Sequence, residues 1–209
     1  MAYPTYYTDT VSRNLKEKGQ AGSALTGTIA AALAADGVVW TLRYPETAPM
    51  PGAGPSGKRL YVQRISVTAV VGTAFTTPVT LGRHLKLVRG APTSGTASNP
   101  SGGAAYTMVR KRSDGAANHG ETLGVGRVAT TAALTTTGIT FEANAIRRLA
   151  MSGSGSSGSI ITATWSFDGV DADPIYLLPG ELVALAAGAT MDAAGTFELT
   201  VDVDAVEVP

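Results

Sequence analysis

Hydrophobic and polar side chains alternate over much of the chain after residue 23, most regularly in residues 197–208. Up to residue 205 the apolar residues occupy the odd positions and polar residues lie between them: Phe197, Leu199, Val201, Val203 and Ala205 against Glu198, Thr200, Asp202 and Asp204. Successive side chains of a strand point to opposite faces, so this pattern predicts a strand with one buried and one solvent-facing side. It is typical of an antiparallel sheet that is wet on one face.

Comparable runs predict further strands, at 24–33, 38–44, 58–71, 79–89, 106–112, 160–167, 175–178 and 182–187, and two shorter strand-like pieces lie at 139–142 and 145–149. The alternation slips by one position near Gln63-Arg64, which predicts a β-bulge there. In the run 79–89, Leu85 and Leu87 are expected to point inward, and His84, Lys86 and Val88 outward.

Turn residues separate these runs. Asp36-Gly37 predicts a hairpin between the strands at 24–33 and 38–44. Pro179-Gly180 before Glu181 predicts a structural turn, because proline fixes φ and glycine permits a positive φ. The Gly/Ser-rich residues 152–159 are interpreted as a long hairpin loop rather than a domain linker, since the strands on both sides are needed to complete one sheet.

About eight strands, long crossover loops and no internal repeat predict an all-β fold. We expect a two-sheet, jelly-roll-like β-sandwich formed by a single domain over residues 24–209. Residues 1–23 are polar, could form at most a turn or two of helix, and are expected to be an N-terminal arm.

Charge narrows the range of partners. Lys and Arg number 16 and Asp and Glu number 16, so the chain has no cationic surplus for nucleic acid or for an anionic membrane. The start of the chain lacks a signal-peptide pattern, and the most apolar stretch, 29–35, is too short to span a bilayer. Only 15% of residues are charged, which favours association with other molecules and predicts a protein that works in an assembly.

No residue pattern predicts catalysis or a bound cofactor or metal. Cysteine is absent, and the carboxylates Asp168, Asp171 and Asp173 lack the spacing of a calcium loop. The two histidines, His84 and His119, lie in different contexts and are expected to be solvated. Gly124-Val125-Gly126 lacks the frame of a phosphate-binding loop and is interpreted as a flexible loop. The clusters Arg110-Lys111-Arg112 and Arg147-Arg148 are interpreted as solvated faces.

The arm carries the candidate interaction residues, namely Tyr3, Tyr6, Tyr7 and Arg13. Tyrosine rings bring a large contact area at a low cost in conformational entropy, and they are enriched at protein interfaces. We predict that they anchor the arm to a partner. The loops at 90–103 and 113–126 are expected to become ordered only in an assembly.

The end of the chain resembles a known class of proteins. Asp171-Ala172-Asp173-Pro174-Ile175-Tyr176-Leu177-Leu178-Pro179-Gly180-Glu181-Leu182, followed by Met191-Asp192-Ala193-Ala194-Gly195-Thr196-Phe197-Glu198-Leu199-Thr200-Val201, is similar to the closing strands of jelly-roll virion proteins of tailed bacteriophages. These are the decoration or cement proteins of the capsid and some tail-associated relatives. Residues 60–90 resemble the opening hairpin of the same class.

The resemblance implies a structural protein without enzymatic activity, made in the host cytoplasm and located on the capsid surface of the virion. Its partners would be the major capsid protein and further copies of itself, as a homodimer or homotrimer, with no nucleic acid or membrane. The alternative is a tail-associated module that binds a receptor or glycan through the loops at one end of the sandwich. A β-sandwich hydrolase is a weaker third alternative, because no acid/base pair can be named.

Overall fold

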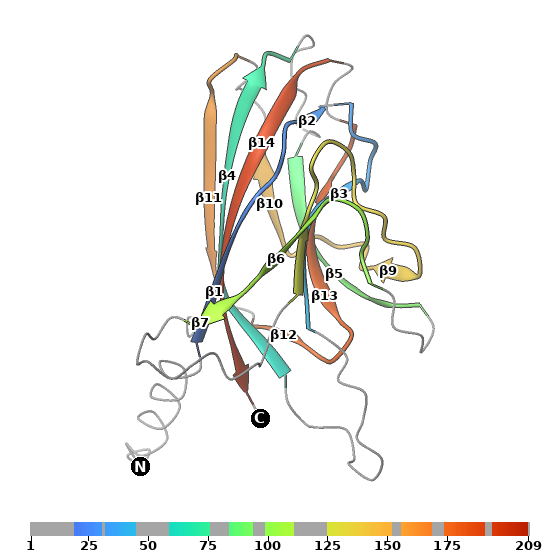
Figure 1. The fold of residues 1–209 in the computed structure, drawn as a ribbon, viewed down its shortest axis with the longest axis vertical. Helices are drawn as coiled ribbons and strands as arrows, with labels where there is room; N and C mark the ends of the chain where they lie inside the picture. The colour runs from blue at the N-terminus through green and yellow to red at the C-terminus, as the bar shows by residue number, and fades with distance from the viewer. Residues whose placement is uncertain are drawn as a thin grey trace.

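The computed structural model describes residues 19–30, 32–44, 59–75, 84–93, 99–110, 125–151, 156–168, 174–190 and 194–208. Within these ranges every regular element is a β-strand, and the strands form two antiparallel sheets that pack face to face (Figure 1). The prediction of an all-β, two-sheet sandwich is confirmed. No helix in the described ranges is long and apolar enough to cross a membrane.

Sheet A is the first of the two sheets. Its main path runs in the order β11-β4-β14-β1-β7, while β12 pairs with β4 and β2 pairs with β14. The bounds of its strands are β1 Gly19–Leu25, β2 Ile29–Ala30, β4 Arg59–Thr73, β7 Val109–Arg110, β11 Ile160–Ser166, β12 Ile175–Leu177 and β14 Thr196–Val208. In Figure 1, β11, β4 and β14 run side by side along the left of the sandwich.

Sheet B follows the order β10-β5-β13-β3-β8-β6, and β9 pairs with β5. Its strands are β3 Val38–Arg43, β5 His84–Pro92, β6 Ala104–Thr107, β8 Val125–Val128, β9 Ile139–Phe141, β10 Arg147–Ala150 and β13 Leu182–Ala187. The four strands predicted after residue 159 all form, as β11 to β14.

The core lies between the sheets and is made by alternate residues of the long strands. The odd-numbered apolar residues of β14 from Phe197 to Ala205 are all buried, as the alternation predicts. The predicted bulge also forms: Asp204 pairs with Arg64 and Ala205 with Val62, which leaves Gln63 as the extra residue of β4. This bulge restores the inward direction of Leu60 and Val62, and both are buried.

The central strands of sheet B are buried on both faces. Every residue of β3 and β13 is buried, including Thr41 and Arg43. Leu85 and Leu87 of β5 point inward as predicted, but the prediction that Val88 faces solvent is wrong, since Val88 is buried. Val88 pairs with Ala184, which pairs with Thr41, and this row lies on the face turned away from sheet A. That face is covered by other parts of the chain.

The Asp36-Gly37 turn connects the two sheets instead of closing a hairpin. β1 and β2 belong to sheet A, whereas β3 belongs to sheet B, so the predicted hairpin is wrong. Asp36 adopts a positive φ of 63°, and the Gly37 amide donates to the Ala34 carbonyl over 3.0 Å. The turn chemistry was recognised correctly, but it reverses the chain between layers rather than between neighbouring strands.

Three further sequence predictions differ from the structure. The arm was expected to extend to residue 23, but β1 begins at Gly19, so residues 19–23 pair with β14. Gly126 lies in β8 rather than in a flexible loop. Residues 152–159 join β10 of sheet B to β11 of sheet A, so they connect two layers of one sandwich and are not a hairpin loop.

Candidate functional site

The predicted interaction residues Tyr3, Tyr6, Tyr7 and Arg13 lie outside the described residues. Their role as anchors therefore stays a prediction. Five further residues for which the sequence made a prediction also lie outside the described residues, namely Lys111, Arg112, His119, Asp171 and Asp173. Asp168 follows β11, and no group of three or more metal-binding side chains occurs in the described part of the chain. His84 begins β5 and is half-buried, with its ring packed over Gly188.

The outer face of sheet A is an accessible surface formed by β11, β4, β14 and β1. Cross-strand pairing aligns its side chains in rows: one row joins Thr162, Thr68, Thr200 and Leu25, and the next joins Thr164, Ser66, Asp202 and Ser23. Directly paired residues point to the same side of a sheet. The Ser66 and Thr164 hydroxyl oxygens are 3.1 Å apart. We refer to the seven of these residues other than Leu25 as the hydroxyl face.

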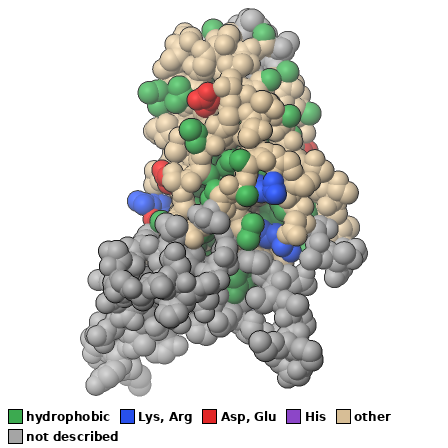
Figure 2. Space-filling model, in the orientation of Figure 1, with side chains coloured by type: hydrophobic (Ala, Val, Ile, Leu, Met, Phe, Trp, Pro, Cys, Tyr) green, Lys and Arg blue, Asp and Glu red, His purple; other side chains and the backbone are tan. Residues whose placement is uncertain are grey.

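Hydrophobic side chains border the hydroxyl face. Leu25 is 65% exposed, Ile160 67% and Val70 38%. Ile160 pairs with Val70, so two of them form one continuous patch at the end of β11 and β4. The view in Figure 2 likewise shows hydrophobic side chains in small patches, with few charged side chains among the described residues. Such a surface loses little charge hydration when another protein covers it.

The charged side chains beside the hydroxyl face have polar partners. The Arg64 guanidinium lies 2.7 Å from the Asp204 carboxylate, and the Thr28 hydroxyl donates to Glu198 over 2.7 Å. Asp202 is exposed in the row of Ser66. The face is therefore polar through hydroxyl groups rather than through net charge.

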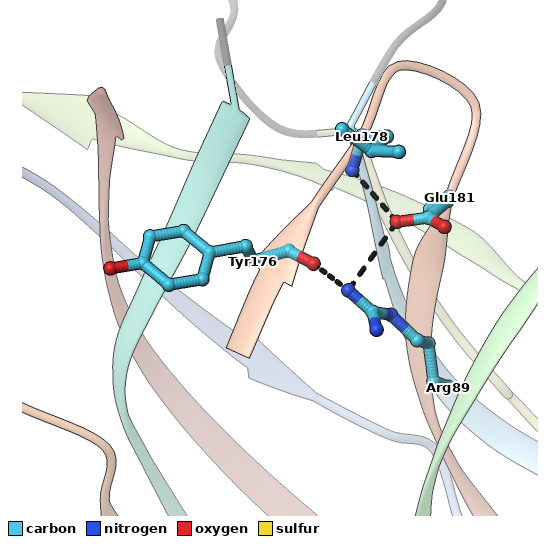
Figure 3. Close-up of polar contacts among 4 residues, drawn as sticks. All are labelled: Arg89, Tyr176, Leu178 and Glu181. Atoms are coloured by element: carbon cyan, nitrogen blue, oxygen red, sulfur yellow. Dashed lines mark hydrogen bonds and ion pairs between the residues drawn. The ribbon is translucent and has the colours of Figure 1, made fainter. Parts of the chain in front are cut away.

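A separate polar network holds the corner between β12 and β13 (Figure 3). The Arg89 guanidinium donates to the Tyr176 carbonyl and lies 3.5 Å from the Glu181 carboxylate. The other contact of that carboxylate comes from the Leu178 amide, which donates to it over 2.8 Å. The predicted Pro179-Gly180 turn forms here: Gly180 has a φ of 91°, and the Glu181 amide donates to the Leu178 carbonyl over 2.9 Å. This geometry confirms its structural role.

A cleft of about 350 Å³ adjoins this corner. Arg89, Glu142, Asn144 and Arg147 contribute its polar lining, and Ile175 contributes apolar lining. The Arg147 guanidinium lies 5.5 Å from the centre of the Phe167 ring and donates to the Ile146 carbonyl over 2.9 Å. Arg147 is therefore packed and partly buried, unlike the solvated side chain expected from sequence. The lining offers donors and acceptors that suit a hydroxylated ligand.

Two tyrosines near this end of the sandwich stack on each other. The rings of Tyr61 and Tyr176 are 5.0 Å apart, and the Tyr61 hydroxyl donates to the Phe167 carbonyl over 2.5 Å. Burial raises the pKa of Tyr61 above its usual value, and the charge of Asp168 adds to the rise. Tyr61 therefore stays protonated at neutral pH and acts as a structural donor.

The sequence contained a signal for the hydroxyl face, namely the polar residues at alternate positions of 60–70 and 160–166. It contained no signal for the register that aligns them across four strands. Comparison with protein families and with curated proteins finds no match for this chain.

Proposed function

We propose that the chain is a virion structural protein, a decoration or cement protein that binds the outside of a bacteriophage capsid. In this role it stabilises contacts between major capsid subunits, as a homodimer or homotrimer. The observation that carries the proposal is the hydroxyl face with its border of Leu25, Val70 and Ile160, which combines hydroxyl groups, exposed apolar area and little net charge. Asp202 is the one charged residue of this face, so a shell subunit that covers it would desolvate a single carboxylate.

We also propose that the sandwich is a jelly roll. Sheet A contains the order β1-β14-β4-β11 and sheet B the order β3-β13-β5-β10. The chain alternates between the sheets from β3 to β5, and its last two strands each insert between earlier strands. Two interlocked Greek keys produce this connectivity, which supports the jelly-roll assignment.

The first test is the copy number in purified virions, measured by quantitative mass spectrometry against the major capsid protein. Hundreds of copies per particle support a decoration protein. A few copies, or none, would reject it. With a high copy number, removal of residues 1–18, which leaves β1 intact, is expected to lower the temperature at which the shell disrupts, because the predicted arm anchors would be lost.

A second test addresses the face itself. Thr68→Lys places a charge in the middle of the hydroxyl face, where a covering subunit would have to desolvate it. We expect this variant to lose co-sedimentation with shells assembled from the major capsid protein alone. Thr137→Lys is the matched control, since Thr137 is exposed in the segment before β9. Equal binding by both variants would show that the hydroxyl face is not the contact.

The cleft beside Arg89 favours the second candidate function, a tail-associated module that binds a glycan. Arg147, Glu142 and Asn144 line it, and hydrogen-bonding side chains around a partly apolar floor are typical of sugar sites. A low copy number confined to the tail, with binding to host cells that Asn144→Ala removes, would support this alternative over the capsid role.

A further inference from the structure

The outer edge of sheet A is formed along most of its length by β11, which runs along the left border of the molecule in Figure 1. β11 pairs with β4 on one side, and among the described residues no strand pairs with its other side. An edge strand presents a row of backbone N–H and C=O groups that can pair with another strand. The properties of β11 therefore decide whether this edge is open to a partner.

Natural proteins block edge strands with charges, prolines, bulges or short lengths. The seven residues of β11, Ile160–Ser166, contain no charged residue and no proline, and their register with β4 is continuous. The other outermost strands in the described ranges are short or charged. β7 has two residues, β6 has four, and β10 has four and carries Arg147 and Arg148. β11 is thus the one long and uncharged edge among these strands.

The pairing of β11 with β4 determines which backbone groups remain available. The Phe167 amide donates to the Gln63 carbonyl over 2.8 Å, which sets the phase of the ladder. Hydrogen-bonded positions alternate in an antiparallel pair, so Ile161, Ala163 and Trp165 bond to β4. The N–H and C=O groups of Ile160, Thr162, Thr164 and Ser166 then face away from β4.

This arrangement is self-complementary. If two copies of β11 pair antiparallel about Ala163, Thr162 lies opposite Thr164 and Ile160 opposite Ser166, so the outward-facing groups of each copy bond to those of the other. On the inner face Ile161 lies opposite Trp165, a pairing of β-branched and aromatic side chains that stabilises sheets. Ile161 and Ala163 are only partly buried, so a second copy would cover them further.

Charge does not oppose such a pairing. β11 contains no charged side chain, and the chain as a whole has equal numbers of acidic and basic residues, 16 of each. Two copies of an uncharged strand meet without the repulsion that like charges opposite each other would cause.

We propose that β11 is a self-pairing edge, through which a second copy of this chain joins sheet A about a two-fold axis at Ala163. The two outer faces then form one continuous sheet surface across both copies. This inference goes beyond the proposed function, because the pairing holds whatever the dimer binds.

The test uses the full-length chain and measures its oligomeric state by sedimentation velocity over a range of concentrations. Thr164→Pro removes an N–H that faces away from β4, so the bonds within sheet A are kept while those to the second copy are lost. We expect a dimer for the unmodified chain, and for the variant a dissociation constant raised by at least about tenfold. Thr68→Lys is the matched control: it changes the same face on a central strand and is expected to leave the dimer intact.

A cross-linking experiment tests the register and does not depend on how well Thr164→Pro folds. The chain contains no cysteine, so Ala163→Cys creates a single thiol. At the two-fold axis the two Cα atoms would lie about 4.5 Å apart, which a disulfide can span. Ala163→Cys is expected to form covalent dimers under mild oxidation, much faster than Thr164→Cys. A monomer at all concentrations, or a dimer unaffected by Thr164→Pro together with equal cross-linking at both positions, would overturn the proposal.

These outcomes are separate from the capsid proposal. Thr68→Lys is expected to lose shell binding and keep the dimer. If the chain proves to be a monomer, self-pairing fails, but binding of the monomer to shells can still be measured and tests the capsid proposal separately.

Discussion

Sheets A and B differ in what covers their outer faces. In sheet A, residues of β4 and, up to Val203, of β14 alternate between buried and accessible, and outer residues of both strands contribute to the hydroxyl face. In sheet B, β3 and β13 are buried along their whole length. The additional cover comes from segments inserted between β5 and β10. Phe141 and Ile139 pack against Gly90, and the Arg43 guanidinium donates to the side-chain oxygen of Asn99.

This difference separates two kinds of sequence pattern. A strand with one wet face alternates, as β14 does from Phe197 to Val203, whereas a strand covered on both faces is a continuous apolar run, as Leu182–Ala187 is. The outer face of a strand of the first kind is available to a partner. A strand of the second kind has its outer face covered by other segments of the same chain, so that face is not available.

The largest expected effect comes from a charge placed on each outer face in turn. Ala184→Asp on β13 would bury an unpaired carboxylate, because Ala184 is fully buried. We expect a loss of about 4 kcal/mol in the free energy of unfolding, or failure to fold. Thr68→Asp on β4 is expected to cost less than about 1 kcal/mol, since Thr68 is partly exposed. Urea unfolding measures both, and equal losses would contradict the difference in cover.

The next effect concerns the closeness of packing in each sheet. A Cβ atom on Gly126 of β8 would lie 1.9 Å from the Tyr106 ring, whereas on Gly72 of β4 it would lie 2.9 Å from the Thr196 hydroxyl. Gly126→Ala therefore forces the ring to move, and we expect it to cost about 1–3 kcal/mol. Gly72→Ala is expected to cost less, because only a small side chain must adjust. Thermal unfolding of the two variants checks the order.

Alkaline pH should distinguish the two sheets through their tyrosines. Burial raises the pKa of Tyr106 in sheet B strongly, and that of Tyr61 in sheet A less. A raised pKa means that the unfolded chain loses its proton first, so stability is fully present below about pH 10 and falls as the pH rises further. We expect Tyr106→Phe to reduce this alkaline loss more than Tyr61→Phe does.

Urea unfolding of the three proteins at pH 8 and pH 11 provides the measurement. At pH 8, Tyr106→Phe should cost about 1 kcal/mol, because it removes the bond from the hydroxyl to the Thr41 carbonyl, 3.3 Å long. The same pH dependence in all three proteins would rule out these tyrosines as its cause.

The smallest effect is expected from the ion pair on the outer face of sheet A. The Arg64 side chain is 53% exposed, so its attraction to Asp204 is screened by solvent. Arg64→Ala is expected to reduce stability by less than about 1 kcal/mol, and by less still in high salt. A large, salt-independent loss would show that the Asp204 carboxylate, whose side chain is only 11% exposed, depends on Arg64 to remain charged in the folded protein.

The sequence predicted the features that depend on local patterning. The period-two alternation of β14, the bulge at Gln63 and the turn at Gly180 each follow from a few neighbouring residues. Which sheet a strand joins depends on distant contacts, and for that reason the local pattern at Asp36-Gly37 predicts a hairpin that does not form. The burial of Val88 was missed because its cover comes from residues far away in the sequence. The hydroxyl face could be predicted strand by strand, but not as one aligned surface.

The position of the last two strands determines when the molecule can fold. β13 lies between β5 and β3, and β14 lies between β4 and β1, so that Gly19 pairs with Val206. Until both strands are present, neither sheet has its centre, and the earlier strands expose open edges. Pairings between such distant residues slow folding, since a long loop must close before any contact forms. During synthesis the sandwich therefore forms late, and residues 182–208 determine when both sheets can be completed.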